Sequence, residues 1–383
     1  MVVTTFFPKG LGLPLPKSPP VREWRDGFEI VRVPCFRWWS GEAVYAFFEL
    51  VLARILLARE RKIDLVYAVQ YQVAAHVART AAIAGFPTVL KFACGGSFGD
   101  LKQLELRSDQ DELRAALGRI DRYACLSKQV LAEVEEASLP KERCLVVRNG
   151  VDTRTFSPEG PKAELGPGRW IVFLGRHDPQ KRIHVLIRAF AKVFERVPDA
   201  RLACAGWGPE ETALRALARE LGLAERVSFL GVRNDVPELL RAASVFVLPS
   251  AAEGLPNALL EALSVGVPSV VTNIPGTDEV VRDGEEALMV PVDDEAALAR
   301  AIERLLTDEE LSKRLASAGR ELVAREFDME RVVDHHVAIF ESLRRPRRAV
   351  VRRELARIYG SFAVALVIGW FKAALRRARV FSG

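Results

Sequence analysis

Two cations in the second half of the chain have the residue types and the spacing to hold a diphosphate. Arg176 and Lys181 flank the turn from an apolar run into a helical pattern. Fixed cations beside the free N–H groups of a helix start form a good anion clamp. They would also stabilise the negative charge that builds on a departing diphosphate. The alternative interpretation is a solvated, basic start of a helix.

Two carboxylates follow further along. Glu253 lies in a Gly/Pro loop after an apolar run, and seven residues separate it from Glu261, about one turn inside the next helical pattern. Both can face one polyol, because a carboxylate accepts two hydrogen bonds with full charge. Alternatively, Glu253 favours the positive helix start and Glu261 is a solvated surface residue. Because Leu259, Leu260 and Leu263 surround Glu261, we expect its carboxylate to need a partner.

Three further loops follow apolar runs. Gly206 and Gly208 allow either a close approach of the backbone to a ligand or a sharp turn. The loop at 230–235 could read a nucleobase with its backbone groups, although its Asn or Asp could equally cap the next helix. The backbone N–H groups of residues 272–276 could complete a phosphate site.

The elements that must position these residues alternate between short apolar runs and helical patterns, which is typical of a parallel sheet with crossover helices. The predicted strands are 1–6, 28–33, 65–68, 88–92, 122–126, 144–147, 170–174, 201–205, 227–229, 245–248, 269–271 and 287–290. The predicted helices include 41–61, 72–84, 181–194, 210–221, 236–242, 258–265, 295–307 and 309–325.

We therefore expect an α/β fold of two facing, doubly wound Rossmann-like domains, with ligands at the carboxyl ends of the strands. The expected domains are an acceptor-side domain at 1–156 and a nucleotide-sugar domain at 157–325, which a Pro- and Gly-rich loop separates. Residues 326–343 form a connection back to the first domain, and 344–383 a basic tail. Residues 2–8 resemble a second strand and its loop, so we expect the first domain to lack its initial strand, loop and helix.

Composition narrows the classes of function. The first nine residues show no secretory signal pattern, so we expect the cytoplasm. Five scattered cysteines form no CxxC pair, which argues against a disulfide framework or a zinc site. The net charge of +5 comes from the tail, where eleven Arg and Lys face one Glu from residue 344 onward. The rest of the chain is therefore mildly acidic, which is atypical of a nucleic-acid enzyme.

The tail has a second feature, an uncharged run at 358–371 between its basic segments. A membrane span needs about 20 apolar residues, so this run is too short to cross a bilayer comfortably. An interfacial helix on an anionic membrane fits better. The alternative is a helix that packs on the protein's own surface.

Several of these segments resemble one family. Gly175-Arg176 with Gln180-Lys181, the run Gly206-Trp207-Gly208-Pro209, and Glu253 through Glu261 resemble the retaining glycosyltransferases of family 4, which have the GT-B fold. The run Arg148-Asn149-Gly150-Val151-Asp152 resembles the linker motif of that family.

The resemblance implies roles for individual residues. Arg176 and Lys181 would hold the donor diphosphate, Glu253 would lie against the donor sugar, and Glu261 would accept the ribose hydroxyls. It further implies a helix over 325–342 that crosses back to the first domain. It implies catalysis without a bound metal or other cofactor, with the nucleotide-sugar as substrate and with front-face substitution. A covalent intermediate on a carboxylate is the alternative mechanism.

These arguments yield a set of candidate residues. The catalytic candidates are Glu253, Arg176 and Lys181. The donor-binding candidates are Gly175, Gly206, Gly208, Val232, Arg233, Gly254, Leu255, Asn257, Glu261 and Gly276. The acceptor-side candidates are Lys91, Asp100 and Asn149; Asp100 ends a segment in which family members usually carry a histidine.

The predicted function is transfer of a sugar, with retention, from a UDP-, GDP- or ADP-linked donor to a hydroxyl of a glycan or lipid-linked acceptor. The expected place is the cytoplasm, either free or at the inner face of the cell membrane, and no nucleic-acid partner is expected. Two alternatives stay open: a catalytically impaired nucleotide-sugar-binding protein, and a sugar-nucleotide epimerase of the same architecture.

Overall fold

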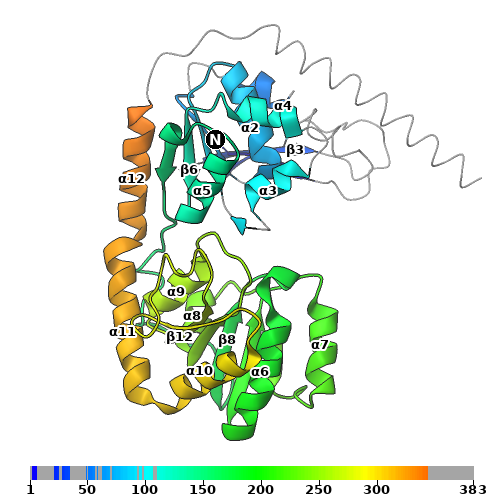
Figure 1. Cartoon of the computed structure of the whole chain (residues 1–383), viewed down its shortest axis with the longest axis vertical. Coiled ribbons are helices and arrows are strands. Elements are labelled where there is room, and N and C mark those ends of the chain that lie inside the picture. Colours follow the sequence, from blue (N-terminus) through cyan, green and yellow to red (C-terminus); the bar gives the residue numbers. More distant parts are fainter. Residues whose placement is uncertain are drawn as a thin grey trace, which may run out of the picture. The chain divides into compact units, whose positions relative to one another are not determined.

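The computed structural model describes residues 2–6, 21–25, 28–34, 49, 51–56, 58, 63–69, 71–92, 95–96, 99–106 and 110–343. The chain divides into two compact units. One unit contains Met1–Lys91, Arg107–Tyr123 and Phe340–Gly383, and the other contains Phe92–Leu106 and Ala124–Ile339. The predicted alternation of strands and helices is confirmed (Figure 1). The predicted domain boundaries stay a prediction, and the basic tail lies outside the described residues.

Among the described residues of the first 150, seven strands form two sheets, ordered β1-β3-β2 and β4-β5-β6-β7. Their bounds are β1 Val2–Phe6, β2 Val21–Arg25, β3 Phe28–Pro34, β4 Val66–Val69, β5 Thr88–Phe92, β6 Arg122–Cys125 and β7 Cys144–Val146. Strand β1 is parallel to β3, whereas β2 is antiparallel to it. Strand β2 was not predicted, because Val21–Arg25 has two charged residues, an arginine and a glutamate, between its apolar ones.

The helices of this region include α2 Tyr71–Ile83, α3 Asp100–Glu105, α4 Gln110–Leu117 and α5 Lys128–Glu136. A buried ionic cluster connects α2 to the helical residue Glu49. The Glu49 carboxylate accepts hydrogen bonds from Arg79 and lies 2.7 Å from Nδ1 of His76. His76 is thus a buried packing residue. Part of the helix predicted at 41–61 lies outside the described residues.

Six parallel strands form the other sheet, in the order β10-β9-β8-β11-β12-β13. Their bounds are β8 Arg169–Leu174, β9 Ala200–Ala205, β10 Val227–Gly231, β11 Val245–Leu248, β12 Ser269–Thr272 and β13 Leu288–Val290. Strands β11 and β12 are buried along their whole length. Such continuous burial is typical of a parallel sheet that helices cover on both faces.

The helices that cover this sheet are α6 Ile183–Arg196, α7 Glu211–Glu220, α8 Val236–Arg241, α9 Asn257–Val265, α10 Glu295–Thr307 and α11 Glu309–Glu326. Helix α6 packs against α7, α10 and β9, whereas α9 packs against α8, α11, β11 and β12 (Figure 1). In α6, the residues Ile183, Leu186, Ile187 and Phe190 recur at helical spacing and are fully buried. Their burial holds the first turn of α6, next to Lys181, at the end of β8.

The predicted helix over 325–342 is present but begins four residues later than predicted. Helix α11 ends at Glu326, and α12 spans Met329–Ser342. Between them Phe327 is fully buried, and Asp328 forms an isolated bridge with Val151. Thr153 donates a 2.5 Å hydrogen bond to the Asp328 carboxylate. The segment after residue 150 is therefore bound to this break. No helix among the described residues is long and apolar enough to cross a membrane.

The loops that follow β8 and β9 contact each other backbone to backbone. Gly175 donates a 3.0 Å hydrogen bond to the carbonyl of Ala205, and Gly206 has a φ of +134°. A Cβ on Gly206 would lie 1.8 Å from the carbonyl oxygen of Gly175. A Cβ on Gly208 would lie 2.2 Å from the carbonyl oxygen of His177. Both glycines are therefore required by close packing.

This contact yields a prediction for Gly206→Ala. The added methyl group would meet a backbone carbonyl that cannot turn away, so the two loops must separate. We expect a loss of about 3 kcal/mol in the free energy of unfolding, as for a strained and overpacked site. Gly118→Ala is the control, because its nearest backbone atom would be 3.5 Å away. Urea unfolding would measure both, and equal midpoints would contradict the packing argument.

Candidate active site

The carboxyl ends of five strands bring the predicted site loops to one edge of the six-stranded sheet. The register pairs Leu174 with Ala205, and Leu248 with Val271. Since neighbouring parallel strands end side by side, the loops that carry Gly175, Gly206, Val232, Glu253 and Gly276 follow one another along that edge. The donor-binding candidates on these loops are thus gathered as predicted, although their roles stay predictions.

Lys181 and Glu253, for which separate roles were predicted, form an ion pair. The ammonium Nζ of Lys181 lies 2.6 Å from Oε1 of Glu253, and the Glu253 residue is only 8% exposed. Ser250 donates a 2.6 Å hydrogen bond to the same Oε1. Oε2 of Glu253 makes no hydrogen bond to any described residue, so one carboxylate oxygen keeps its capacity to accept.

Backbone contacts fix this pair. The side-chain amide of Gln180 donates to the carbonyl of Ala252 at 2.6 Å, and Ala251 N–H donates to the carbonyl of Gln180 at 2.8 Å. Gln180 makes both contacts, so the loop after β8 is hydrogen-bonded to the loop after β11 directly beside Lys181. The relative position of the ammonium and the carboxylate is set by the main chain.

Gly276 brings in the loop after β12. It has a φ of +95°, and a Cβ there would lie 2.6 Å from the carbonyl oxygen of Gly254 and 2.7 Å from that of Glu253. Thr272 donates a 2.5 Å hydrogen bond to the carbonyl of Ser250. These contacts support the Glu253 loop from the side opposite Lys181.

Glu261 lies in α9, and the partner that its carboxylate was expected to need is not a residue of the described part of the chain. It makes no hydrogen bond or ion pair with the described residues. Burial raises the pKa of its carboxyl group to about 7. The group can therefore change charge near neutral pH, and a hydroxyl-rich ligand could supply the missing hydrogen bonds.

Two further candidates lie near the start of α9 and after β10. The side-chain amide of Asn149 donates to Asn257 at 2.9 Å and to the carbonyl of Leu255 at 3.3 Å. Arg233 forms an ion pair with Asp235. Asp235 makes no side-chain cap to α8, which removes the helix-cap alternative for that residue.

Two acceptor-side candidates, Lys91 and Asp100, belong to the first half of the sequence. Lys91 is a half-buried residue of β5, and burial lowers the pKa of its ammonium group. Asp100 is the first residue of α3 and is buried. The structure gives neither a substrate contact, so their acceptor role stays a prediction. Within the described residues, no three His, Cys, Asp or Glu side chains converge as metal ligands would.

Two models of known protein families match this chain. The glycosyl transferases group 1 model matches residues 161–322, and the glycosyl transferase 4-like domain model matches residues 2–150. Together the two models span most of the chain. The chain belongs to the group 1, family 4-like glycosyltransferases.

Individual relatives of the family agree. The lipopolysaccharide core biosynthesis glycosyltransferase LpsE of Rhizobium meliloti is 37% identical over 45% of this chain and 49% of its own length. The UDP-Gal:alpha-D-GlcNAc-diphosphoundecaprenol alpha-1,3-galactosyltransferase of Escherichia coli is 28% identical over 73% of this chain and 75% of its own. The chain spans about half the length of the curated relatives it matches first, such as LpsE.

Solved structures bear on the fold alone. HepE of Anabaena, crystallised with UDP and glucose, superposes with a TM-score of 0.69 at 22% identity over 82% of this chain and 86% of HepE. The predicted GT-B-like fold class is thereby confirmed.

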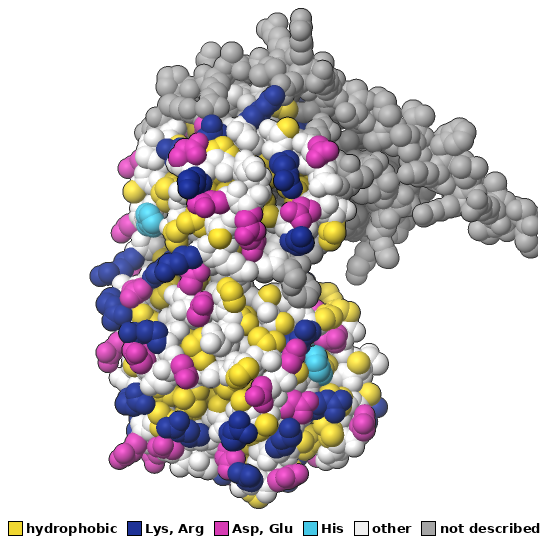
Figure 2. Space-filling view, viewed as in Figure 1, with side chains coloured by type: hydrophobic (Ala, Val, Ile, Leu, Met, Phe, Trp, Pro, Cys, Tyr) yellow, Lys and Arg dark blue, Asp and Glu magenta, His cyan; other side chains and the backbone are white. Residues whose placement is uncertain are grey.

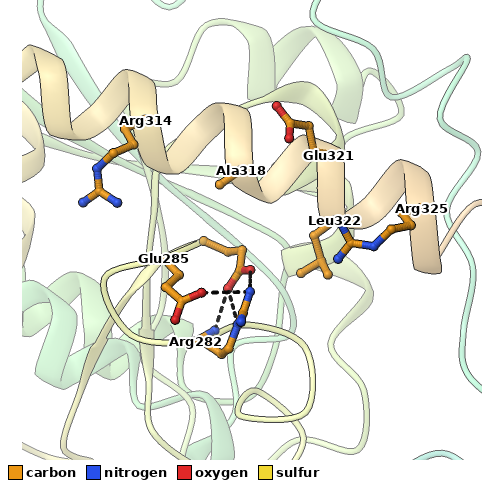
Figure 3. A pocket seen from close by; sticks show the side chains of 8 residues that line it. Arg282, Glu285, Arg314, Ala318, Glu321, Leu322 and Arg325 are labelled. Carbon is orange, nitrogen blue, oxygen red and sulfur yellow. Dashed lines mark hydrogen bonds and ion pairs between the residues drawn. The ribbon is translucent and has the colours of Figure 1, made fainter.

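The pocket in Figure 3 lies elsewhere on this glycosyltransferase family member. It has a volume of about 340 Å³ and lies between α11 and the residues that precede β13. Residues before a parallel strand lie at its amino end, so the pocket is at the edge opposite the site loops. Arg282 pairs with Glu285 and Glu286, and Arg314 donates to the carbonyl of Gly284 at 2.9 Å. The pocket charges are largely matched by one another.

On the outer surface, too, positively and negatively charged side chains lie near one another. Positive and negative side chains alternate over the described residues on the face in Figure 2. Examples are Lys192 with Glu295 and Arg196 with Glu303, both between α6 and α10. Such exposed pairs contribute little to stability.

Sequence reasoning missed three residues that support the site: Ser250, Thr272 and Asp178. Ser250 had a usable signal, since a serine at a buried strand end three residues before a carboxylate can donate to it. Asp178 lies between the two predicted cations and pairs with Arg176 at 2.6 Å. Thr272 offered no signal, because its contact depends on which strand lies beside β11.

The raised pKa of Glu261 yields a prediction for Glu261→Gln. Its folded pKa of about 7 exceeds the value of about 4.3 for an unfolded chain. The folded state is therefore favoured at acid pH, where the Glu261 carboxyl is protonated. This contribution to the free energy of unfolding is lost as pH rises through 7. We expect Glu261→Gln to stabilise the ligand-free protein by about 2 kcal/mol more at pH 8 than at pH 5.

Urea midpoints at the two pH values would measure this difference. Glu220→Gln, which changes an exposed carboxylate on α7, is the control and should show no such dependence. A Glu261→Gln effect that is equal at both pH values would contradict the burial argument.

Proposed function

We propose that the chain transfers a sugar from a nucleoside-diphosphate sugar to a hydroxyl group of an acceptor, with retention of the anomeric configuration. The observation that carries the proposal is the Lys181–Glu253 pair at the carboxyl edge of the six-stranded sheet. A cation for the diphosphate and a carboxylate for the sugar hydroxyls are held in contact, with Gly-rich loops on either side of them.

In this proposal each residue has one task. Arg176 and Lys181 bind the donor diphosphate and stabilise the charge that grows on it as the bond to the sugar breaks. The free Oε2 of Glu253 accepts a hydroxyl of the donor sugar, and Glu261 accepts those of the ribose. The backbone around Val232 contacts the nucleobase, and the glycines let the phosphates approach the main chain.

The transfer itself is a front-face substitution. The acceptor oxygen bonds to the anomeric carbon on the face from which the diphosphate leaves. The acceptor proton passes to an oxygen of the departing phosphate, so the products are a glycoside and a nucleoside diphosphate. No step needs a protein nucleophile. The task of the chain is to position the two partners and to stabilise charge.

We further propose that the donor carries uridine diphosphate and that the acceptor is a glycan or a lipid-linked glycan. HepE binds UDP in its crystals, and the E. coli relative is named for a UDP-galactose donor and a diphosphoundecaprenol-linked acceptor. Lys91, Asp100 and Asn149 are the proposed acceptor-side residues. The epimerase alternative needs paired acid and base groups, and the site edge offers a single buried histidine, His177, among the described residues.

Lys181→Ala and Glu253→Gln test the proposal. Removing the cation or the carboxylate takes away charge stabilisation that is strongest in the transition state, so we expect losses of about 100-fold or more in kcat/KM for UDP-sugar turnover. Lys192→Ala is the matched control, since Lys192 is an exposed lysine on α6 that pairs with Glu295. Release of UDP, with and without glycan acceptors, would be measured.

The outcomes separate the alternatives. UDP binding without turnover in any acceptor would favour a binding protein, and interconversion of two UDP-sugars would favour an epimerase. Wild-type rates in both site variants would refute the assignment of the site.

We also propose that the basic tail at 344–383 holds the protein at an anionic membrane surface inside the cell. We expect the chain to co-sediment with vesicles that contain about 30% phosphatidylglycerol and to be released by 0.5 M salt, since each basic residue near such a surface contributes about 1 kcal/mol that salt screens. Neutral phosphatidylcholine vesicles are the control. Equal sedimentation with both vesicle types would contradict this prediction.

A further inference from the structure

One carboxylate beside the proposed donor site has no task in the mechanism above. Asp178 follows Arg176 by two residues, and its side chain is only 12% exposed. Neither of its oxygens makes a hydrogen bond within the described residues. Its partner is a charged one: Nη2 of Arg176 lies 2.6 Å from Oδ2.

The position of Asp178 in the chain would ordinarily give it another task. It is the N-cap residue of the short 3-10 helix Pro179–Lys181, and an aspartate at such a position usually accepts a backbone N–H of the first turn. Here the side chain makes no cap hydrogen bond. The carboxylate is turned toward Arg176 instead, and a buried carboxylate without that cation would be costly.

The backbone around Asp178 is held firmly. His177 is fully buried. Its main-chain N–H donates to the carbonyl of Trp207 at 2.9 Å, and its carbonyl accepts from the main-chain N–H of Glu210 at 3.0 Å. Asp178 is extended, with φ of −128° and ψ of 165°. Side chains two residues apart in an extended segment point to the same side. The backbone therefore holds the Asp178 carboxylate in place, on the same side of the segment as the side chain of Arg176.

Arg176 needs such a fixed partner. Its side chain is 75% exposed, so without a partner it would sample many rotamers. Ordering a long, flexible side chain during binding costs conformational entropy. A guanidinium has five N–H donors in a rigid fork, so it can keep the ion pair with Asp178 and still offer N–H groups to a phosphate.

We propose that Asp178 is a positioning residue that holds the Arg176 guanidinium ready for the donor diphosphate. The inference rests on the proposed function, because it assumes that Arg176 binds the diphosphate. Asp178 itself touches no substrate in this scheme. It acts through Arg176, and every effect of Asp178 on binding must then disappear when Arg176 is absent.

A double-mutant cycle tests this dependence, with UDP as the probe and isothermal titration calorimetry as the readout. Asp178→Asn should weaken UDP binding about tenfold, as is usual for residues that orient a ligand-binding group. In the Arg176→Ala background the same change should have no further effect. Arg176→Lys should lose affinity and become insensitive to Asp178→Asn, because lysine lacks the planar fork.

The matched control lies at the other end of the same strand. Arg169 begins β8 and pairs with Asp199 at 2.5 Å. Asp199→Asn removes an Arg–Asp pair far from the loops and should leave UDP affinity unchanged. Thermal unfolding of each variant shows whether it is folded, and the exposed Arg176 variants keep the test available if Asp178→Asn is unstable.

The results separate two kinds of failure. Unchanged UDP affinity in Asp178→Asn, or an equal loss with and without Arg176, overturns the positioning role. If the unsubstituted chain binds UDP but Arg176→Ala binds it equally well, the diphosphate role of Arg176 is wrong. If the folded, unsubstituted chain binds no UDP, the proposed donor is wrong.

Discussion

The nearly buried carboxylate of Glu253 is the constraint on which the arrangement of the site depends. A carboxylate that is 8% exposed must have partners, because the loss of hydration otherwise costs several kcal/mol. Its partners Lys181 and Ser250 come from the loop after β8 and the end of β11. The charge therefore binds two neighbouring strand ends together, and Gly276 adds the end of β12 by backbone contact. The order of strands in the sheet therefore determines which side chains can contact Glu253 in the site.

Much of the fold could be predicted from the sequence. The apolar runs of the six-stranded sheet are continuous because both faces are covered, and helices such as α6 show a clear apolar stripe. Predicted and observed bounds of these strands differ by at most two residues. Strand β2 escaped prediction, because it pairs antiparallel at a sheet edge and has charged residues in it. The boundary between α11 and α12 was predicted, but the contact of Asp328 with Val151 was not, since the two residues are far apart in the sequence.

The position of the candidate residues at one edge of the sheet was predictable from the sequence, but their pairing was not. The types and spacing of Arg176, Lys181 and Glu253 indicated charge chemistry on a phosphorylated sugar. That Lys181 contacts Glu253, and Arg176 contacts Asp178, follows from strand order and from main-chain hydrogen bonds that no local pattern encodes. Glu261 shows the same limit. Its apolar neighbours predicted burial correctly, whereas the absence of a protein partner, and hence its raised pKa, required the surroundings of α9.

The backbone contacts at Gly206, Gly208 and Gly276 divide the site edge into parts that can vary and parts that cannot. Main chains that touch without intervening side chains move only together, so a change in the length of one loop would displace its neighbours. Exposed side chains on the same loops, such as Trp207 and Val232, have no such restriction. Within this scaffold, new sugar or base preferences are therefore accessible by side-chain exchange at fixed loop length, and libraries for directed evolution are best confined to those positions.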